Sequence, residues 1–194
     1  DSSTSRGLGD VYKRQVDDNL GNYRIPEAAR ALQEFVDDMS NWYVRRCRDR
    51  FWAKGMEQDK VNAYMTLYTA LVTVCKAAAP MIPFMTEEIY QNIVRSVDAS
   101  AKESIHLCDF PVYNAEQVDE KLEADMDLVL KIVVLGRACR NGAAIKNRQP
   151  IGQMYVKAEA SLPDYDEAII LDELNVKNIT FTAVSYTHLR AHET

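Results

Sequence analysis

The chain has 194 residues, of which 47% are hydrophobic and 27% charged, and its formal net charge is −6. This composition is typical of a folded globular protein and excludes a disordered or fibrous one. No apolar run approaches the roughly 20 residues of a membrane-spanning helix, so we expect no membrane contact. The four cysteines form no CxxC pair, which predicts reduced thiols, a cytoplasmic location and no metal site.

The two ends of the chain differ from its body. Residues 1–15 and 185–194 show no apolar periodicity, and TSRGLGDVYKRQ and SYTHLRAHET within them resemble translated sequencing-adaptor read-through. We therefore expect both segments to be non-native tails that lie outside the fold.

Apolar residues recur at helical spacing in four segments of the body, namely residues 26–52, 59–79, 86–97 and 118–142. Asp59 and Thr86 are the expected N-caps of the second and third helices. Large side chains form the predicted inner face of the second helix, namely Val61, Tyr64, Met65, Tyr68, Leu71, Val72 and Cys75. The predicted inner faces of the others include Val36, Val97, Val118, Leu135 and Cys139.

The period changes after Pro150. Apolar residues alternate with polar ones at 154–158 and again around Ile179 and Phe181, which is typical of strands, and residues 164–174 between them indicate a short acidic helix. The sequence therefore predicts a mostly α fold. A helical bundle occupies residues 16–144, and a small βαβ extension follows at 145–184.

Positive charge is concentrated near the end of the first predicted helix, at Arg45, Arg46, Arg48, Arg50 and Lys54 against the single acid Asp49. At about 100° per residue, Arg50 falls on the apolar face and Arg46 at its margin, which predicts pairing with acids or carbonyls at the core edge. Arg45, Arg48 and Trp52 fall on the outward face. An exposed tryptophan beside two arginines can stack a base and hold its phosphates. Alternatively, another element covers Trp52 and the arginines are merely solvated.

A second basic group joins the fourth helix to the first strand, at Arg137, Arg140, Lys146 and Arg148. A loop with asparagine, glycine and basic residues can follow a phosphate backbone, although a solvated connector is the open alternative. The candidate RNA-binding residues are therefore Arg45, Arg48, Trp52, Arg140, Lys146 and Arg148. We find no pattern of a catalytic nucleophile, phosphate-binding glycine loop or metal cluster, so we expect no catalytic residue and no cofactor in this chain.

Five motifs in this order closely resemble the region that follows the catalytic core of isoleucyl-tRNA synthetases: DDMSNWYVRRCRDRFW (37–52), APMIPFMTEEIYQN (79–92), ESIHLCDFP (103–111), IKNRQPI (145–151) and ELNVKNI (173–179). The resemblance covers about residues 18–183. It implies the helical anticodon-binding domain of a class I aminoacyl-tRNA synthetase, followed by a small α/β extension.

The resemblance further implies a parent enzyme that uses ATP and Mg²⁺ to attach isoleucine to its tRNA. The HIGH and KMSKS signatures of the family are absent from this sequence, so we expect catalysis in a part of the parent chain upstream of this piece. The expected partners are the anticodon stem-loop of the isoleucine tRNA and the rest of the synthetase. The alternatives are a valine, leucine or methionine synthetase, and a non-catalytic helical scaffold that binds protein.

Overall fold

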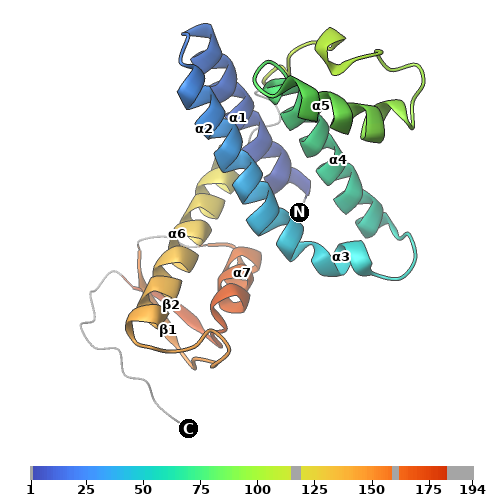
Figure 1. Ribbon diagram of the computed structural model, residues 1–194. Coiled ribbons are helices and arrows are strands. Elements are labelled where there is room, and N and C mark those ends of the chain that lie inside the picture. Colours follow the sequence, from blue (N-terminus) through green and yellow to red (C-terminus); the bar gives the residue numbers. More distant parts are fainter. Residues whose placement is uncertain (1, 115–118, 159–161, 183–194) are drawn as a thin grey trace. The chain divides into compact units, whose positions relative to one another are not determined.

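The computed structural model describes residues 2–114, 119–158 and 162–182, and helices predominate among them (Figure 1). The chain forms two compact units, residues 1–120 and residues 121–194. The mostly α fold with a small α/β element is confirmed. The division between the units precedes the last long helix, whereas we had expected a domain boundary after it, at residue 144. Val118 and the predicted tail at 185–194 lie outside the described residues.

The first unit begins with a helical hairpin of α1 (Ser2–Gly21) and α2 (Ile25–Asp38), which lie side by side in Figure 1. The residues buried between these helices and α4 are Val16, Ala28, Ala31 and Ala77. Tyr12 packs its ring against Phe35 at a centroid distance of 5.1 Å, and its hydroxyl donates to Asp38 Oδ2 at 3.0 Å. The helix therefore includes residues that we had expected to lie outside the fold.

The chain continues helically from α2 to Trp52, but not as the single α-helix predicted. Met39–Val44 forms a π-helical turn, η1, and Arg48–Trp52 forms the short helix α3. Between them, Cys47 departs from helical geometry with φ −80° and ψ 4°. A π turn holds more residues than an α turn and therefore rotates the later side chains of the segment around the helix axis.

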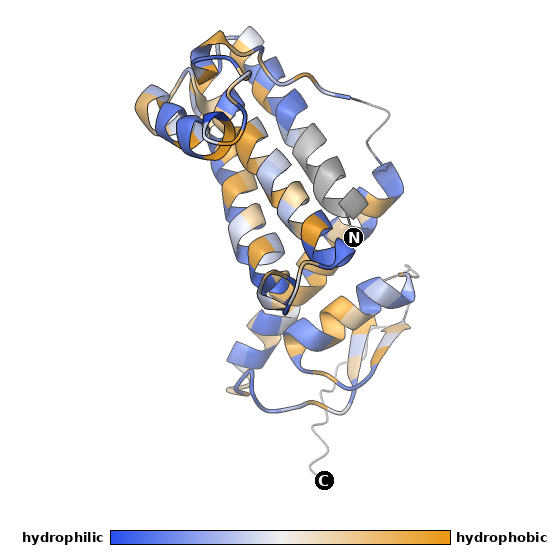
Figure 2. Cartoon of the chain, turned by 90° about the vertical axis from the view of Figure 1, so that its right-hand side faces the viewer, coloured by the Kyte–Doolittle hydropathy of each residue, from blue (hydrophilic) through white to orange (hydrophobic). Residues whose placement is uncertain are grey.

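The inner face of this segment also differs from the prediction. Phe51 is buried, as predicted, but Val36 is 39% exposed, and Phe35, which the predicted face did not include, is buried. Hydrophilic and hydrophobic residues alternate along the long helices of the chain (Figure 2), as expected of helices that bury one face.

Helix α4 (Gln58–Ala78) buries mainly small side chains, and Cys75 is the one member of the predicted stripe among them. Its buried residues are Ala63, Thr66, Cys75, Ala77 and Ala78. Tyr64, Met65 and Tyr68 are 44%, 54% and 38% exposed, so the predicted inner face was wrong at these positions. Small side chains allow close packing of neighbouring helices, which apolar periodicity alone does not reveal.

Helix α5 (Pro83–Tyr90) begins three residues before its predicted cap. Pro83 occupies the first turn, where its missing N–H is not needed. Thr86 is therefore not a cap but a buried residue whose hydroxyl donates to a carbonyl one turn earlier. A π turn, η2 (Gln91–Arg95), extends the helix, and Val97 beyond it is 83% exposed rather than inward-facing.

A 3₁₀ turn, η3 (Ile105–Leu107), is held against α5 by one carboxylate. Glu87 accepts hydrogen bonds from Ser104 Oγ at 2.8 Å and from the backbone N–H of Ile105 at 2.9 Å. Burial by itself raises the pKa of Glu87, but these bonds and one from Gln91 lower that pKa overall.

The second unit contains α6 (Glu120–Gly142), β1 (Met154–Lys157), α7 (Asp164–Leu174) and β2 (Ile179–Thr182). The strands pair in parallel, which confirms the predicted βαβ element. The buried residues of this unit include Met126, Val129, Ile132, Val133, Ile170 and Leu174. Leu135 and Cys139, which we had placed on the inner face of α6, are both exposed.

Candidate nucleic-acid interface

The π-helical turn presents an indole flanked by two guanidinium groups. Trp42 lies in η1, and the Cζ atoms of Arg45 and Arg46 lie 5.8 and 5.9 Å from its ring centroid. This spacing permits cation–π attraction from both arginines. Arg45 also donates from Nε to the carbonyl of Asn41 at 2.9 Å. The positive charges are therefore held in place over an aromatic ring at the protein surface.

Helix α3 adds two exposed side chains on one face. Trp52 is 81% exposed, and Arg48, four residues earlier, is also exposed. Residues at this spacing lie one turn apart on the same side of a helix. The outward placement of Arg45, Arg48 and Trp52 therefore agrees with the prediction, and within the described residues no element covers Trp52.

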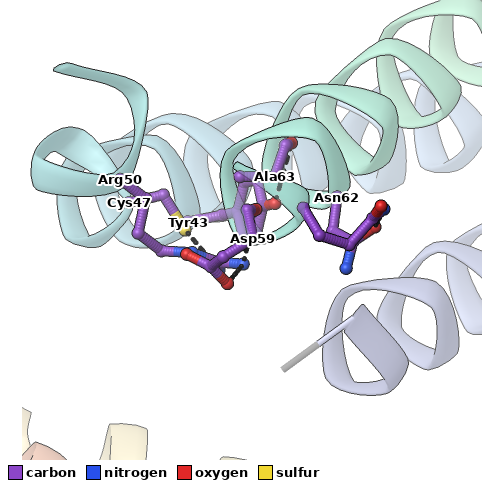
Figure 3. A network of polar contacts seen from close by, with 7 residues as sticks. Tyr43, Cys47, Arg50, Asp59, Asn62 and Ala63 are labelled. Atoms are coloured by element: carbon purple, nitrogen blue, oxygen red, sulfur yellow. Dashed lines mark hydrogen bonds and ion pairs between the residues drawn. The ribbon is translucent and has the colours of Figure 1, made fainter. Parts of the chain in front are cut away.

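The neighbouring side chains of α3 attach it to α4 (Figure 3). Arg50 forms a two-point contact with the carboxylate of Asp59, Nε to Oδ2 at 2.8 Å and Nη2 to Oδ1 at 2.6 Å. Its Nη1 also lies 3.6 Å from Cys47 Sγ. The hydrogen bond between the pair raises the pKa of Arg50 and lowers that of Asp59. Asp59 thus pairs with Arg50 instead of capping α4, and the prediction that Arg50 binds an acid is confirmed.

Further contacts support the short helix from beneath. Phe51 is 9% exposed, and its ring lies 5.0 Å from that of Tyr64 and 6.4 Å from that of Tyr43. The hydroxyl of Tyr43 donates to the carbonyl of Ala63 at 3.1 Å. At the end of α3, Lys60 Nζ donates to a backbone carbonyl at 2.7 Å. Packing and hydrogen bonds therefore fix the position of α3, which carries the exposed residues Arg48 and Trp52.

The second unit carries its own basic turn, at residues 146–149 between α6 and β1. Lys146 and Arg148 are exposed, as predicted. Arg137 of the same basic group is paired with Glu173, Nη2 to Oε2 at 2.5 Å, so its charge is partly neutralised.

Arg140 was predicted to contact RNA, but the structure gives it a different environment. The residue is 3% exposed, and among the described residues its side chain donates only to backbone carbonyls. Burial lowers its pKa. A guanidinium that is enclosed in this way cannot reach a phosphate, so we remove Arg140 from the direct RNA contacts. The periodicity did not reveal this because acceptors of Arg140 belong to residues distant in the sequence, Leu174 and Asn175.

The interpretation from sequence also missed Trp42. The spacing of Trp42 to Arg45 and Arg46, three and four residues, is the signal that could have identified the cluster. Within residues 2–114, 119–158 and 162–182, no group of three or more metal-ligating side chains lies together. None of the described helices is sufficiently long and apolar to span a membrane.

Comparison with known proteins identifies the family to which this chain belongs. Residues 10–156 match the family described as "Anticodon-binding domain of tRNA ligase". The match covers most of the chain, so the protein belongs to this family of anticodon-binding domains.

Particular relatives are named isoleucine–tRNA ligase. The protein of Clostridium novyi (strain NT) is 55% identical over 170 residues, which are 88% of this chain and 16% of the relative. The protein of Dehalococcoides mccartyi (strain CBDB1) is 46% identical over 168 residues, or 84% of this chain and 16% of the relative. Isoleucine–tRNA ligase 2 of Bacillus cereus is 44% identical over 168 residues, which are also 84% of this chain and 16% of the relative. The resemblance to isoleucyl-tRNA synthetases is thus confirmed, and the chain spans about one sixth of these relatives (16%).

Proposed function

We propose that this chain binds the anticodon arm of the isoleucine tRNA, as the anticodon-binding part of an isoleucine–tRNA ligase. The observation that carries the proposal is the exposed surface of Trp52 and Arg48, a few residues after Trp42 and its two arginines, in a member of the anticodon-binding family. The names of the relatives favour isoleucine over valine, leucine or methionine.

The chemistry of this surface suits an RNA loop. An unpaired base stacks on the exposed indole of Trp52, a contact worth about 1–3 kcal/mol. Arg48 has no hydrogen bond or ion pair with the described residues and is available for a phosphate. Arg45 remains a candidate, although its Nε is engaged with a backbone carbonyl. Lys146 and Arg148 supply two further exposed charges from the second unit.

The activity of the parent protein is part of the same proposal. An isoleucine–tRNA ligase activates isoleucine with ATP and Mg²⁺ and transfers it to tRNA in the cytoplasm. We assign that chemistry to the parts of the parent that this chain does not contain. The chain itself would hold the tRNA at its anticodon end and would make no aminoacyl adenylate.

Fluorescence anisotropy on an anticodon-arm RNA, at several salt concentrations, tests the proposal. Trp52→Ala should weaken binding by about 1–3 kcal/mol with little change in the salt dependence. Arg48→Ala should lower the slope of log affinity against log salt by about 0.7–0.9, because one phosphate contact is lost.

Two exposed residues elsewhere in the first unit provide matched controls. Phe84 on α5 is 90% exposed, and Lys102 lies in the loop before η3. Phe84→Ala and Lys102→Ala should leave RNA affinity unchanged. Wild-type affinity in a folded Arg48→Ala/Trp52→Ala variant would refute the assignment of this surface. It would then favour a scaffold that binds protein.

A further inference from the structure

The basic turn of the second unit has its side chains directed outwards and its carbonyls directed inwards. Lys146, Asn147 and Arg148 are exposed. The N–H of Gln149 closes the turn onto the carbonyl of Lys146 at 2.9 Å. The carbonyls of residues 146, 147 and 149 all accept hydrogen bonds from other parts of the unit. The turn is therefore fixed from its inner side.

Arg140 makes most of these bonds from the last turn of α6. Its Nη1 donates to the carbonyls of Lys146 and Gln149, both at 3.0 Å. Its Nη2 donates to Gln149 at 3.0 Å and to the carbonyls of Leu174 and Asn175 at 2.5 and 3.1 Å. One planar guanidinium thus connects the turn before β1 to the turn before β2, a geometry that the single nitrogen of lysine does not reproduce.

Asn175 provides a second, independent attachment. Its backbone is left-handed, with φ 48°, at the end of α7. From this position Nδ2 donates to the carbonyl of Asn147 at 3.1 Å, and the N–H of Ile151 donates to the carbonyl of Asn175 at 3.0 Å. Two side chains from two different helices therefore determine the shape of one four-residue turn.

Holding the turn in this shape requires the burial of a charged side chain, which lowers the stability of the unit. Arg140 is buried and has no carboxylate partner among the described residues. Burying a charge carries a desolvation cost that neutral carbonyls offset only in part. A turn that serves only as a connector needs no such support, whereas a turn that binds a ligand benefits because ordering it beforehand lowers the entropic cost of binding.

We propose that Arg140 is a positioning residue for RNA binding: it holds the Lys146–Gln149 turn in the shape in which Lys146 and Arg148 meet phosphates of the RNA backbone. This inference rests on the proposed function, because it takes tRNA as the ligand. It gives Arg140 a role through the turn instead of through direct contact with RNA.

The test measures anticodon-arm RNA binding by the full 194-residue chain in a double-mutant cycle. One variant is Arg140→Lys, which keeps the charge but loses the planar fork. The other is Lys146→Ala/Arg148→Ala, which removes the proposed contacts. Arg140→Lys should weaken binding about three- to tenfold, as expected when one or two ordered side chains are released. The salt slope should stay unchanged, because no phosphate contact is deleted.

The combined variant decides between positioning and a merely structural role. If Arg140 acts through the turn, Arg140→Lys has no further effect on affinity once Lys146 and Arg148 are alanine. An equal loss in both backgrounds would overturn the proposal. Unchanged affinity in Lys146→Ala/Arg148→Ala alone would also overturn it, while leaving the proposed function intact if Trp52→Ala still weakens binding.

Asn175→Gly serves as the second variant, in case Arg140→Lys does not fold. Glycine accepts the left-handed backbone and removes only the side-chain bond to Asn147. We expect faster hydrogen exchange at the Gln149 amide and about a twofold to threefold loss of RNA affinity that disappears in the Lys146→Ala/Arg148→Ala background. Faster exchange with wild-type affinity would show that the order of the turn does not matter for RNA binding, and would overturn the proposal.

Discussion

Two adjacent residues of α3 should destabilise the protein to very different extents when truncated. Phe51 is 9% exposed and Trp52 is 81% exposed. At about 25 cal/mol per Å², the roughly 150–200 Å² that a buried phenylalanine removes from water corresponds to about 4–5 kcal/mol. A compact unfolded chain and the retained Cβ reduce this value, so Phe51→Ala should destabilise the first unit by about 3 kcal/mol. Trp52→Ala removes only about 50 Å² of buried surface and should cost about 1 kcal/mol or less.

Urea unfolding followed by tryptophan fluorescence measures these costs separately from the second unit. The chain has two tryptophans, Trp42 and Trp52, and both lie in the first unit. In the Trp52→Ala variant, the remaining signal comes from Trp42 in η1. Because Phe51 anchors the helix that carries Trp52, Phe51→Ala should also weaken RNA binding. This loss of affinity should arise from the loss of stability and not from a lost RNA contact. A loss below about 1 kcal/mol for Phe51→Ala, or equal losses for the two variants, would refute this reasoning.

Two further predictions concern the second unit. Burial, followed by repulsion from a neighbouring carboxylate, raises the pKa of Asp166 above its ordinary value of 3.8. Because the folded-state pKa is the higher one, the free energy of unfolding should rise as the pH falls through that pKa towards 3.8. Asp166→Asn should remove this pH dependence and stabilise the unit at pH 7, because the cost of burying a charged carboxylate is lost. Hydrogen exchange of the α7 amides measures both effects, and a destabilised variant at pH 7 would contradict the prediction. Gly136→Ala should destabilise the unit by about 1–3 kcal/mol despite the helix preference of alanine, because the new Cβ would overlap the methyl groups of buried Leu174. Wild-type stability in a thermal melt followed by circular dichroism would show that Leu174 moves away at no cost.

The elements of the second unit could be predicted from the sequence because their signals are local. Alternation identified both strands, and the acidic helix between them has the predicted bounds, Asp164–Leu174. The outward face of α3 was also predictable, since helical geometry fixes the relation of Arg48 to Trp52 within one turn. In each case the information lies within a few residues of the element itself.

Burial in the helical unit was less predictable, because it depends on the helix that lies opposite. Helix α4 has large residues on one face and small ones on another, and the small face is the buried one. Periodicity locates both faces but does not say which one the partner covers. Arg140 illustrates the same limit, since its acceptors at Leu174 and Asn175 lie far away in the sequence.

The π-helical turn at Met39–Val44 marks a place where the helical segment from α2 to α3 can lose one residue. A π turn accommodates one residue more than an α turn without interrupting the helix. Removing one residue from this segment therefore leaves an ordinary α-helical turn, with the helical path still continuous on both sides. Insertions or deletions in α2, which precedes this turn, would shift every later side chain around the axis. Chains of this type should thus tolerate a single-residue gap at Met39–Val44, although the indole of Trp42 would then face another direction.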